Sequence, residues 1–160
     1  MPVDPLVYTT RWRVRSYELD SNGHVNNAVY LNYAEQVTIE HAEASGYGAE
    51  WTTAHGGLWV VHRNLLTYRR PAVYGDELEL TVRVILVQGA RGVRQTEIRR
   101  AADGELVAEV LTEWVWTRLA DGRPERVPPE LLERGREVTQ ATLARNPSLL
   151  HDLSRLELKS

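Results

Sequence analysis

The sequence lacks cysteine and phenylalanine altogether, and it has a single methionine among its 160 residues. Without cysteine the chain can form no disulfide, no thiolate metal site and no thiolate nucleophile, so covalent chemistry must use oxygen or nitrogen. Lys159 is the only lysine, and all other formal positive charge is arginine. The formal net charge of -3 argues against a surface built to bind nucleic acid.

Other absences narrow the class of protein further. There is no long apolar run and no signal-like N-terminus, so we expect a cytoplasmic protein without a membrane partner. A Gly-x-Ser-x-Gly elbow and a phosphate-cradling Gly-x-x-x-x-Gly-Lys are both missing, which disfavours an α/β serine hydrolase and a P-loop enzyme. The five histidines never show metal-ligand spacing, and we therefore expect neither a metal nor another cofactor.

Alternating apolar and polar residues predict five strands. The first runs from Tyr8 to Arg15, and a second from about Leu58 to Tyr68, ending before Pro71. In the third, Leu78 to Leu86 place their apolar side chains on one face. The turn 89–92 leads into a weaker strand, 93–100, and Asp103-Gly104 is a strong hairpin signal before the last strand, 106–119.

Three- and four-residue spacing predicts one long helix from Ala28 to about Ser45, with Gly46 at its C-terminal cap. A short helical segment is expected within 48–55. Pro128 and Pro129 can open a further helix over 130–145, which we interpret as a packing or partner helix. The predicted fold is α+β, with a five-stranded antiparallel sheet wrapped around the long helix. We divide the chain into a domain at 1–121 and a C-terminal helical extension at 122–160.

The segment between the first strand and the long helix carries chemistry. Asp20-Ser21-Asn22-Gly23 fits a type I turn, and Asn26 or Asn27 can cap the helix that follows. Free N–H groups at a helix N-terminus can hold a developing oxyanion, while a neighbouring carboxylate can attack a carbonyl or draw a proton from water. Turn and cap residues are also common as scaffold, but a turn alone does not require His24 or a second asparagine.

The string Asp-x-x-Gly-His-Val-Asn-Asn at 20–27, followed by Ala-Val-Tyr-Leu-Asn-Tyr-Ala-Glu, resembles the signature of the hot-dog-fold acyl thioesterases. That group includes 4-hydroxybenzoyl-CoA thioesterase and the plant acyl-ACP thioesterases. A second segment, 60–76, with Tyr68-Arg69-Arg70-Pro71-Ala72 and Gly75-Asp76, is similar to another landmark of the family. The resemblance covers about residues 8 to 119.

The resemblance implies hydrolysis of an acyl-CoA or acyl-ACP thioester, with Asp20 as general base or nucleophile and the backbone N–H of Asn27 as the carbonyl donor. Asp20, Asn22 and His24 resemble the catalytic cluster of the acyl-ACP enzymes. The family also implies a homodimer or homotetramer with an active site between subunits, and basic residues, here Arg91 and Arg94, that hold CoA phosphates.

Three further residues on the long helix are candidates for substrate binding. Tyr30 and Tyr33, one turn into the helix, could line an acyl pocket, and Glu35 could face the substrate channel or a neighbouring subunit. Two other functions stay open from the sequence. One is a hot-dog hydratase or dehydratase acting on enoyl thioesters, whose histidine typically follows the aspartate by five residues instead of four. The other is a non-catalytic acyl-thioester binding protein, which would be indifferent to loss of Asp20.

Overall fold

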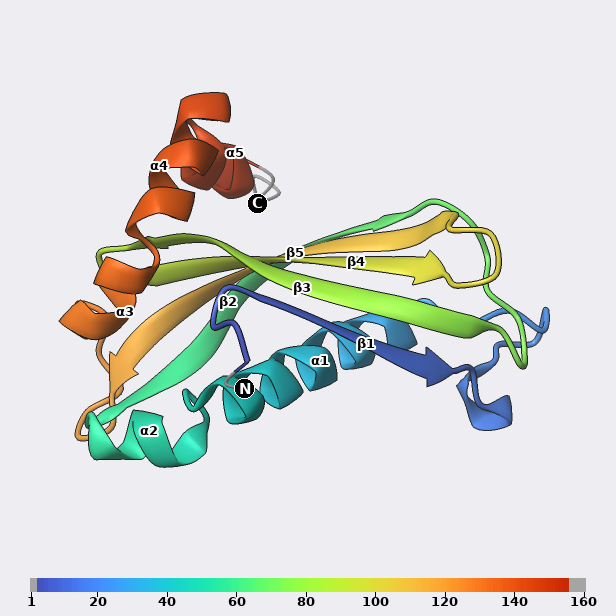
Figure 1. The fold of residues 1–160 in the computed structure, drawn as a ribbon, viewed down its shortest axis with the longest axis horizontal. Coiled ribbons are helices and arrows are strands. Elements are labelled where there is room, and N and C mark those ends of the chain that lie inside the picture. Colours follow the sequence, from blue (N-terminus) through green and yellow to red (C-terminus); the bar gives the residue numbers. More distant parts are fainter. Residues whose placement is uncertain (1–2, 156–160) are drawn as a thin grey trace.

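The computed structural model describes residues 3–155, and in that range the chain forms one five-stranded antiparallel sheet with a long helix across one face (Figure 1). The strands lie in the order β1-β3-β4-β5-β2. Their bounds are β1 Val7–Arg13, β2 Gly57–Tyr68, β3 Glu77–Gln88, β4 Arg91–Arg100 and β5 Leu106–Arg118. The helices are α1 Val29–Ser45, α2 Ala49–Ala54, α3 Pro129–Arg134, α4 Arg136–Arg145 and α5 Leu149–Arg155, with a 3-10 turn η1 at Ser16–Glu18.

The main core lies between α1 and the sheet. Tyr33 and Val37 of α1 are buried against the inward-facing side chains of β3 and β5, which include Leu80, Val82 and Val107. Helical spacing on α1 and strand alternation on β3 thus meet in one layer, as the periodicity predicted. Gly46 ends α1 in the left-handed conformation with φ of 85°, and the predicted α+β arrangement is confirmed.

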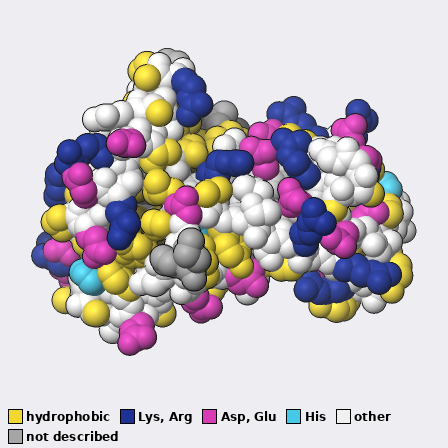
Figure 2. Space-filling model, in the orientation of Figure 1, with side chains coloured by type: hydrophobic (Ala, Val, Ile, Leu, Met, Phe, Trp, Pro, Cys, Tyr) yellow, Lys and Arg dark blue, Asp and Glu magenta, His cyan; other side chains and the backbone are white. Residues whose placement is uncertain are grey.

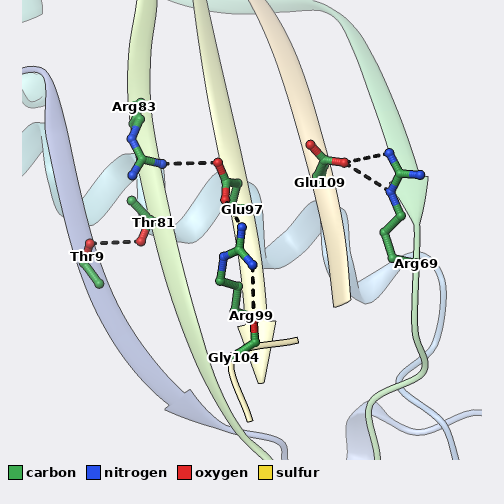
Figure 3. Close-up of polar contacts among 8 residues, drawn as sticks. All are labelled: Thr9, Arg69, Thr81, Arg83, Glu97, Arg99, Gly104 and Glu109. Carbon is green, nitrogen blue, oxygen red and sulfur yellow. Dashed lines mark hydrogen bonds and ion pairs between the residues drawn. The ribbon is translucent and has the colours of Figure 1, made fainter. Parts of the chain in front are cut away.

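The opposite face of the sheet is polar over the half next to the β4–β5 turn. Figure 3 shows these side chains pointing away from α1: Glu97 accepts from Arg83 and Arg99, and Glu109 accepts from Arg69. Glu97 and Glu109 face each other across the β4–β5 pair. Like charges in that position repel, and the arginines around them offset the repulsion.

The other half of this face is covered by the C-terminal helices (Figure 1). Leu149 and Leu153 of α5 form a second buried cluster with Val93 and Leu86. The prediction that Leu86 shares a face with Leu78 is therefore wrong. A register shift between Val84 and Leu86 turns the strand, which is the usual effect of a β-bulge.

The single C-terminal helix predicted over 130–145 is two helices, α3 and α4, and α5 follows them. The break comes at Gly135, where an added Cβ would lie 2.7 Å from Val87 Cγ2. The backbone must approach the sheet closely at this point, and only glycine allows that approach. The proposed boundary at residue 121 stays a prediction. No helix within residues 3–155 is long and apolar enough to cross a membrane.

The β3–β4 turn is shorter than expected. Only Gly89 and Ala90 separate the strands, with Gly89 at φ of 60°, and Arg91 and Gly92 already pair with β3. A two-residue turn with positive φ matches the twist of antiparallel strands, which favours this tight hairpin. Arg91 and Arg94 consequently belong to a strand, where the side chains of alternate residues point to opposite faces.

Candidate active site

Asp20 lies in a tight loop between η1 and α1. Its backbone N–H donates to His24 O at 2.7 Å, and its carbonyl accepts from Gly23 N–H at 3.1 Å. One side-chain oxygen, Oδ1, accepts from the backbone N–H groups of Asn22 at 2.8 Å and His24 at 3.1 Å. Within residues 3–155, Oδ2 has no hydrogen-bond partner, so one half of a partly exposed carboxylate stays free to react.

The loop is anchored to the core on both sides. Val25, which is buried, donates its N–H to Ala72 O at 2.9 Å, and Asn26 N–H donates to Glu18 O at 2.9 Å. Glu18 is itself buried, and its Oε1 accepts from Tyr33 Oη at 2.7 Å and from Arg15 N–H at 2.8 Å. These contacts fix the position of Asp20 relative to α1.

The start of α1 exposes free donors. Ala28 occupies the N-cap position and makes no side-chain cap hydrogen bond, although Asn26 Oδ1 accepts from Ala28 N–H at 3.0 Å. Asn27 does not cap the helix, and its N–H has no acceptor within the described residues. Its carbonyl accepts from Tyr68 Oη at 2.9 Å. A helix N-terminus left open in this way favours an anion.

Asn22 and His24 are exposed, and their side chains make no hydrogen bond within residues 3–155. They contact Asp20 through backbone N–H groups only. The three residues lie in one loop, as predicted from the sequence, but their side chains form no cluster.

Tyr30 and Tyr33 lie in the core, and neither lines the cavity at the far end of α1. Their rings pack edge to face, and Tyr33 also packs against Trp12. Burial raises the pKa of Tyr30 to about 12. Burial and the hydrogen bond to Glu18 raise the pKa of Tyr33 above its ordinary value. The structure of this chain does not support a role for either tyrosine in an acyl pocket, because their side chains are already packed.

Glu35 lies on the exposed face of α1, between the exposed side chains of Leu31 and Ile39. That face points away from the sheet of its own chain. Glu35 was predicted to face either the substrate channel or a neighbouring subunit, and this position favours the neighbouring subunit.

A cavity of about 360 Å³ lies at the opposite end of α1 from the Asp20 loop. Its wall comes from the last turns of α1, from α2, from four strands and from α3, and most of it is apolar. Its lining residues include Thr38, Ala42, Leu58, Trp59, Trp114 and Leu131. Figure 2 shows hydrophobic side chains gathered over this half of the molecule, between α1 and the C-terminal helices.

Arg91 and Arg94 occupy different environments. The Arg91 guanidinium lies 3.2 Å from the carboxylate of Glu113, which is fully buried and also pairs with Arg63 at 2.9 Å. Arg94 borders the cavity and donates to His41 Nδ1 at 2.9 Å. The predicted contact between Arg94 and CoA phosphates is not supported, because this side chain points into the protein.

Two residues of this site were missed by the sequence reasoning. Glu18 and Tyr68 each hold the loop through one side chain, and neither belongs to the Asp20 string. Tyr68 lies within the second landmark, 60–76, and that was the available signal. No group of three histidine, aspartate or glutamate residues in the described part of the chain is placed to hold a metal ion.

Comparison with known proteins matches residues 14–135 to the model of the thioesterase-like superfamily. The long-chain acyl-CoA thioesterase FadM of Escherichia coli is 34% identical over 125 residues, which is 78% of this chain and 94% of that protein. The chain belongs to the thioesterase-like superfamily. The solved structure of YbaW, a probable thioesterase from Escherichia coli, has a TM-score of 0.73 at 32% identity and covers 82% of this chain and 98% of its own.

The palmitoyl-acyl carrier protein thioesterase of Gossypium hirsutum is 24% identical over 96% of this chain. This thioesterase-family chain spans only 38% of that protein. The hot-dog fold and the thioester hydrolase class, both predicted from the Asp20 string, are confirmed.

Proposed function

We propose that this chain hydrolyses acyl-CoA thioesters at the Asp20 loop. The observation that carries the proposal is that one loop holds both a carboxylate oxygen without a hydrogen bond, Asp20 Oδ2, and the unbonded N–H of Asn27, at a helix start that no side chain caps. The E. coli relative, 34% identical, is named for acyl-CoA, and the cotton relative, 24% identical, for acyl carrier protein. The higher identity favours CoA as the carrier.

In the proposed reaction the thioester carbonyl oxygen accepts from Asn27 N–H, which polarises the C=O bond. In the general-base route, Asp20 Oδ2 takes a proton from water as the water oxygen bonds to the carbonyl carbon; the C–S bond then breaks, and the departing thiolate takes that proton from Asp20. In the nucleophilic route, Oδ2 itself bonds to the carbonyl carbon and the C–S bond breaks, and the thiolate takes a proton from the water that then hydrolyses the mixed anhydride, which releases the acid and restores Asp20. A positioned base contributes about 100- to 10,000-fold, and one aimed oxyanion donor about 3 to 4 kcal/mol.

We propose that Asn22 and His24 contribute to this loop chiefly through their backbone. Their N–H groups hold Asp20 Oδ1, which leaves Oδ2 without a hydrogen bond to the described residues. The exposed side chains of both residues remain free to contact the substrate.

The proposal includes a homodimer formed through β2. This strand is an edge of the sheet, and along it Leu58, Val60, Val61, Leu65 and Tyr68 are exposed. Leu31 and Ile39 extend the apolar surface onto α1. A long apolar edge strand normally pairs with another strand, and a two-fold axis pairs β2 with its own copy in antiparallel orientation.

Such pairing has a consequence for the site. Within one chain, Trp59 borders the cavity and Tyr68 holds Asn27, and the two residues are about 30 Å apart along β2 at about 3.3 Å per residue. Antiparallel pairing about a two-fold axis sets the Trp59 end of one β2 beside the Tyr68 end of the other. In the dimer each Asp20 loop therefore approaches the cavity of its partner, and that cavity receives the acyl chain.

A panel of acyl-CoA esters of different chain length, assayed for release of free CoA thiol, tests the function. We expect hydrolysis of at least one chain-length class, with a dimeric mass in solution. Hydration of enoyl-CoA without thiol release, or binding of acyl-CoA without turnover, would contradict the proposal and favour the hydratase or binding-protein alternatives.

A further inference from the structure

Arg94 is a cation inside the fold that lacks a carboxylate partner. It projects from β4 toward α1, and its one hydrogen bond to the described residues is the 2.9 Å contact from Nη1 to His41 Nδ1. No ion pair within residues 3–155 includes it. Glu113, a buried charge on the opposite face of the sheet, is by contrast paired with two arginines.

His41 does not neutralise Arg94. Its Nε2 lies 2.7 Å from Asp4 O, which can only accept, so Nε2 carries the proton and Nδ1 accepts from Arg94. Burial, together with the neighbouring guanidinium, lowers the pKa of His41 and keeps the ring neutral. Burial also lowers the pKa of Arg94 to about 10, which still leaves it charged at neutral pH.

The remaining N–H groups of Arg94 are not sealed in packed protein. The buried polar atoms that lack a hydrogen bond in residues 3–155 include none from Arg94, and the side chain borders the cavity. A guanidinium has five donors in a planar fork that matches a carboxylate. Arg134, the other arginine on the cavity wall, is exposed and already donates to Tyr47 Oη at 2.6 Å.

We propose that the cavity binds an apolar chain that ends in a carboxylate, with Arg94 as the counter-ion and the apolar wall around the chain. A purely apolar occupant would exclude water from the guanidinium and leave its charge without a partner, and this is costly. The volume of about 360 Å³ falls at the lower end of the range of small-ligand sites, which suits a medium-length chain.

Two sources can supply this chemistry. One is a free carboxylic acid, the class of product that thioester hydrolysis releases. The other is an acyl thioester whose acyl group carries a second carboxylate at its far end, and this source rests on the proposed function and on the approach of the partner's Asp20 loop. The two sources differ in whether hydrolysis itself prefers the carboxylate-terminated chain.

Binding is measured on the full chain by tryptophan fluorescence, since Trp59 and Trp114 border the cavity. Decanoate and 1-decanol are the probes, because they share a chain and differ in charge. We expect decanoate to bind at least about tenfold more tightly, the scale of a hydrogen-bonded charge pair. Equal affinity for the two probes would overturn the proposal.

Variants locate the effect. Arg94→Met should remove the preference for decanoate, and Arg94→Lys, which keeps the charge, should retain part of it and serves if the methionine variant does not fold. Ala42→Phe fills the cavity and should weaken both probes equally. Arg99→Met, on the outer face of the same strand, should change neither affinity. A preference that survives Arg94→Met, or one that Arg99→Met removes, would overturn the proposal.

Hydrolysis separates the two sources. Decanoyl-CoA is compared with the mono-CoA thioester of decanedioic acid. A higher kcat/KM for the second, reversed by Arg94→Met, identifies the acyl end of the substrate as the occupant. A decanoate preference in binding without this preference in hydrolysis identifies the free acid. If neither thioester is hydrolysed, the proposed function fails, while the binding result still decides the role of Arg94.

Discussion

At the N-terminal end of α1 the chain exposes a carboxylate and an unbonded N–H, whereas at the C-terminal end of the same helix it encloses an apolar cavity. The first end has the reactive groups. The second has the apolar wall of the cavity, with two arginines, Arg94 and Arg134, and one carboxylate, Glu43, among its lining residues. Under the proposed function neither end is a complete site by itself, and β2, which connects the two, is also the exposed apolar edge.

The largest effect is expected from removing the carboxylate at the N-terminal end of α1. Asp20→Asn should lower kcat by at least about a hundredfold, the scale of a lost positioned base. The loop should stay folded, because the asparagine Oδ1 can still accept from the N–H groups of Asn22 and His24. The loss of kcat is measured by steady-state kinetics on the best acyl-CoA substrate, and thermal unfolding serves as the folding control. Near-native turnover would remove Asp20 from the mechanism.

Separating the two copies should be nearly as severe. Val60→Lys places a charge on the exposed β2 edge, where Val60 is 45% exposed, and should give a monomer with at least about tenfold lower activity on a long acyl-CoA. Thr9→Lys on the opposite edge strand, β1, is the matched control and should stay dimeric and active. The molecular mass of each variant is measured by light scattering, and its activity is measured on the same sample. A fully active monomer would show that one chain suffices.

Loosening the loop tests what holds Asp20 in place. Glu18→Ala removes the buried acceptor of Tyr33 Oη and Arg15 N–H. Leaving such donors unsatisfied costs about 1 to 3 kcal/mol, which urea unfolding should detect as a lower midpoint at constant m. An unchanged midpoint would mean that water replaces the carboxylate without cost.

The smallest effect is expected at Tyr68. Tyr68→Phe removes the hydrogen bond to Asn27 O, worth about 0.5 to 1.5 kcal/mol, and should lower kcat by roughly two- to tenfold with KM nearly constant. Tyr68 is exposed, so the unfolding midpoint should barely move. A change in KM alone would point to a contact with substrate instead of a positioning role.

Local signals in the sequence predicted much of this molecule. The bounds of α1, its glycine cap and the Asp20 turn follow from spacing and turn chemistry that act within a few residues. The five strands were also found, since each carries its own alternation. The family resemblance then supplied the thioester chemistry, which spacing alone left open.

Features that depend on packing between distant segments were not predicted. The bulge that moves Leu86 to the second cluster, the break at Gly135 against Val87, and helix α5 all arise where the C-terminal segment meets β3. Arg94 was predicted from the family resemblance to hold CoA phosphates, and arginine is seldom expected inside a fold. The cavity joins residues from both halves of the chain, so no single stretch of sequence indicates it.

The central claim, that each site joins the Asp20 loop of one copy to the cavity of the other, is tested most directly by subunit complementation. Co-expressing Asp20→Asn with Ala42→Phe chains gives mixed dimers in which one site combines an intact loop with an open cavity. With random pairing, half of the dimers are mixed and each has one working site, so activity on a long acyl-CoA should recover to about a quarter of wild type. Activity no higher than the mean of the two parent variants would contradict the account and place loop and cavity in the same chain.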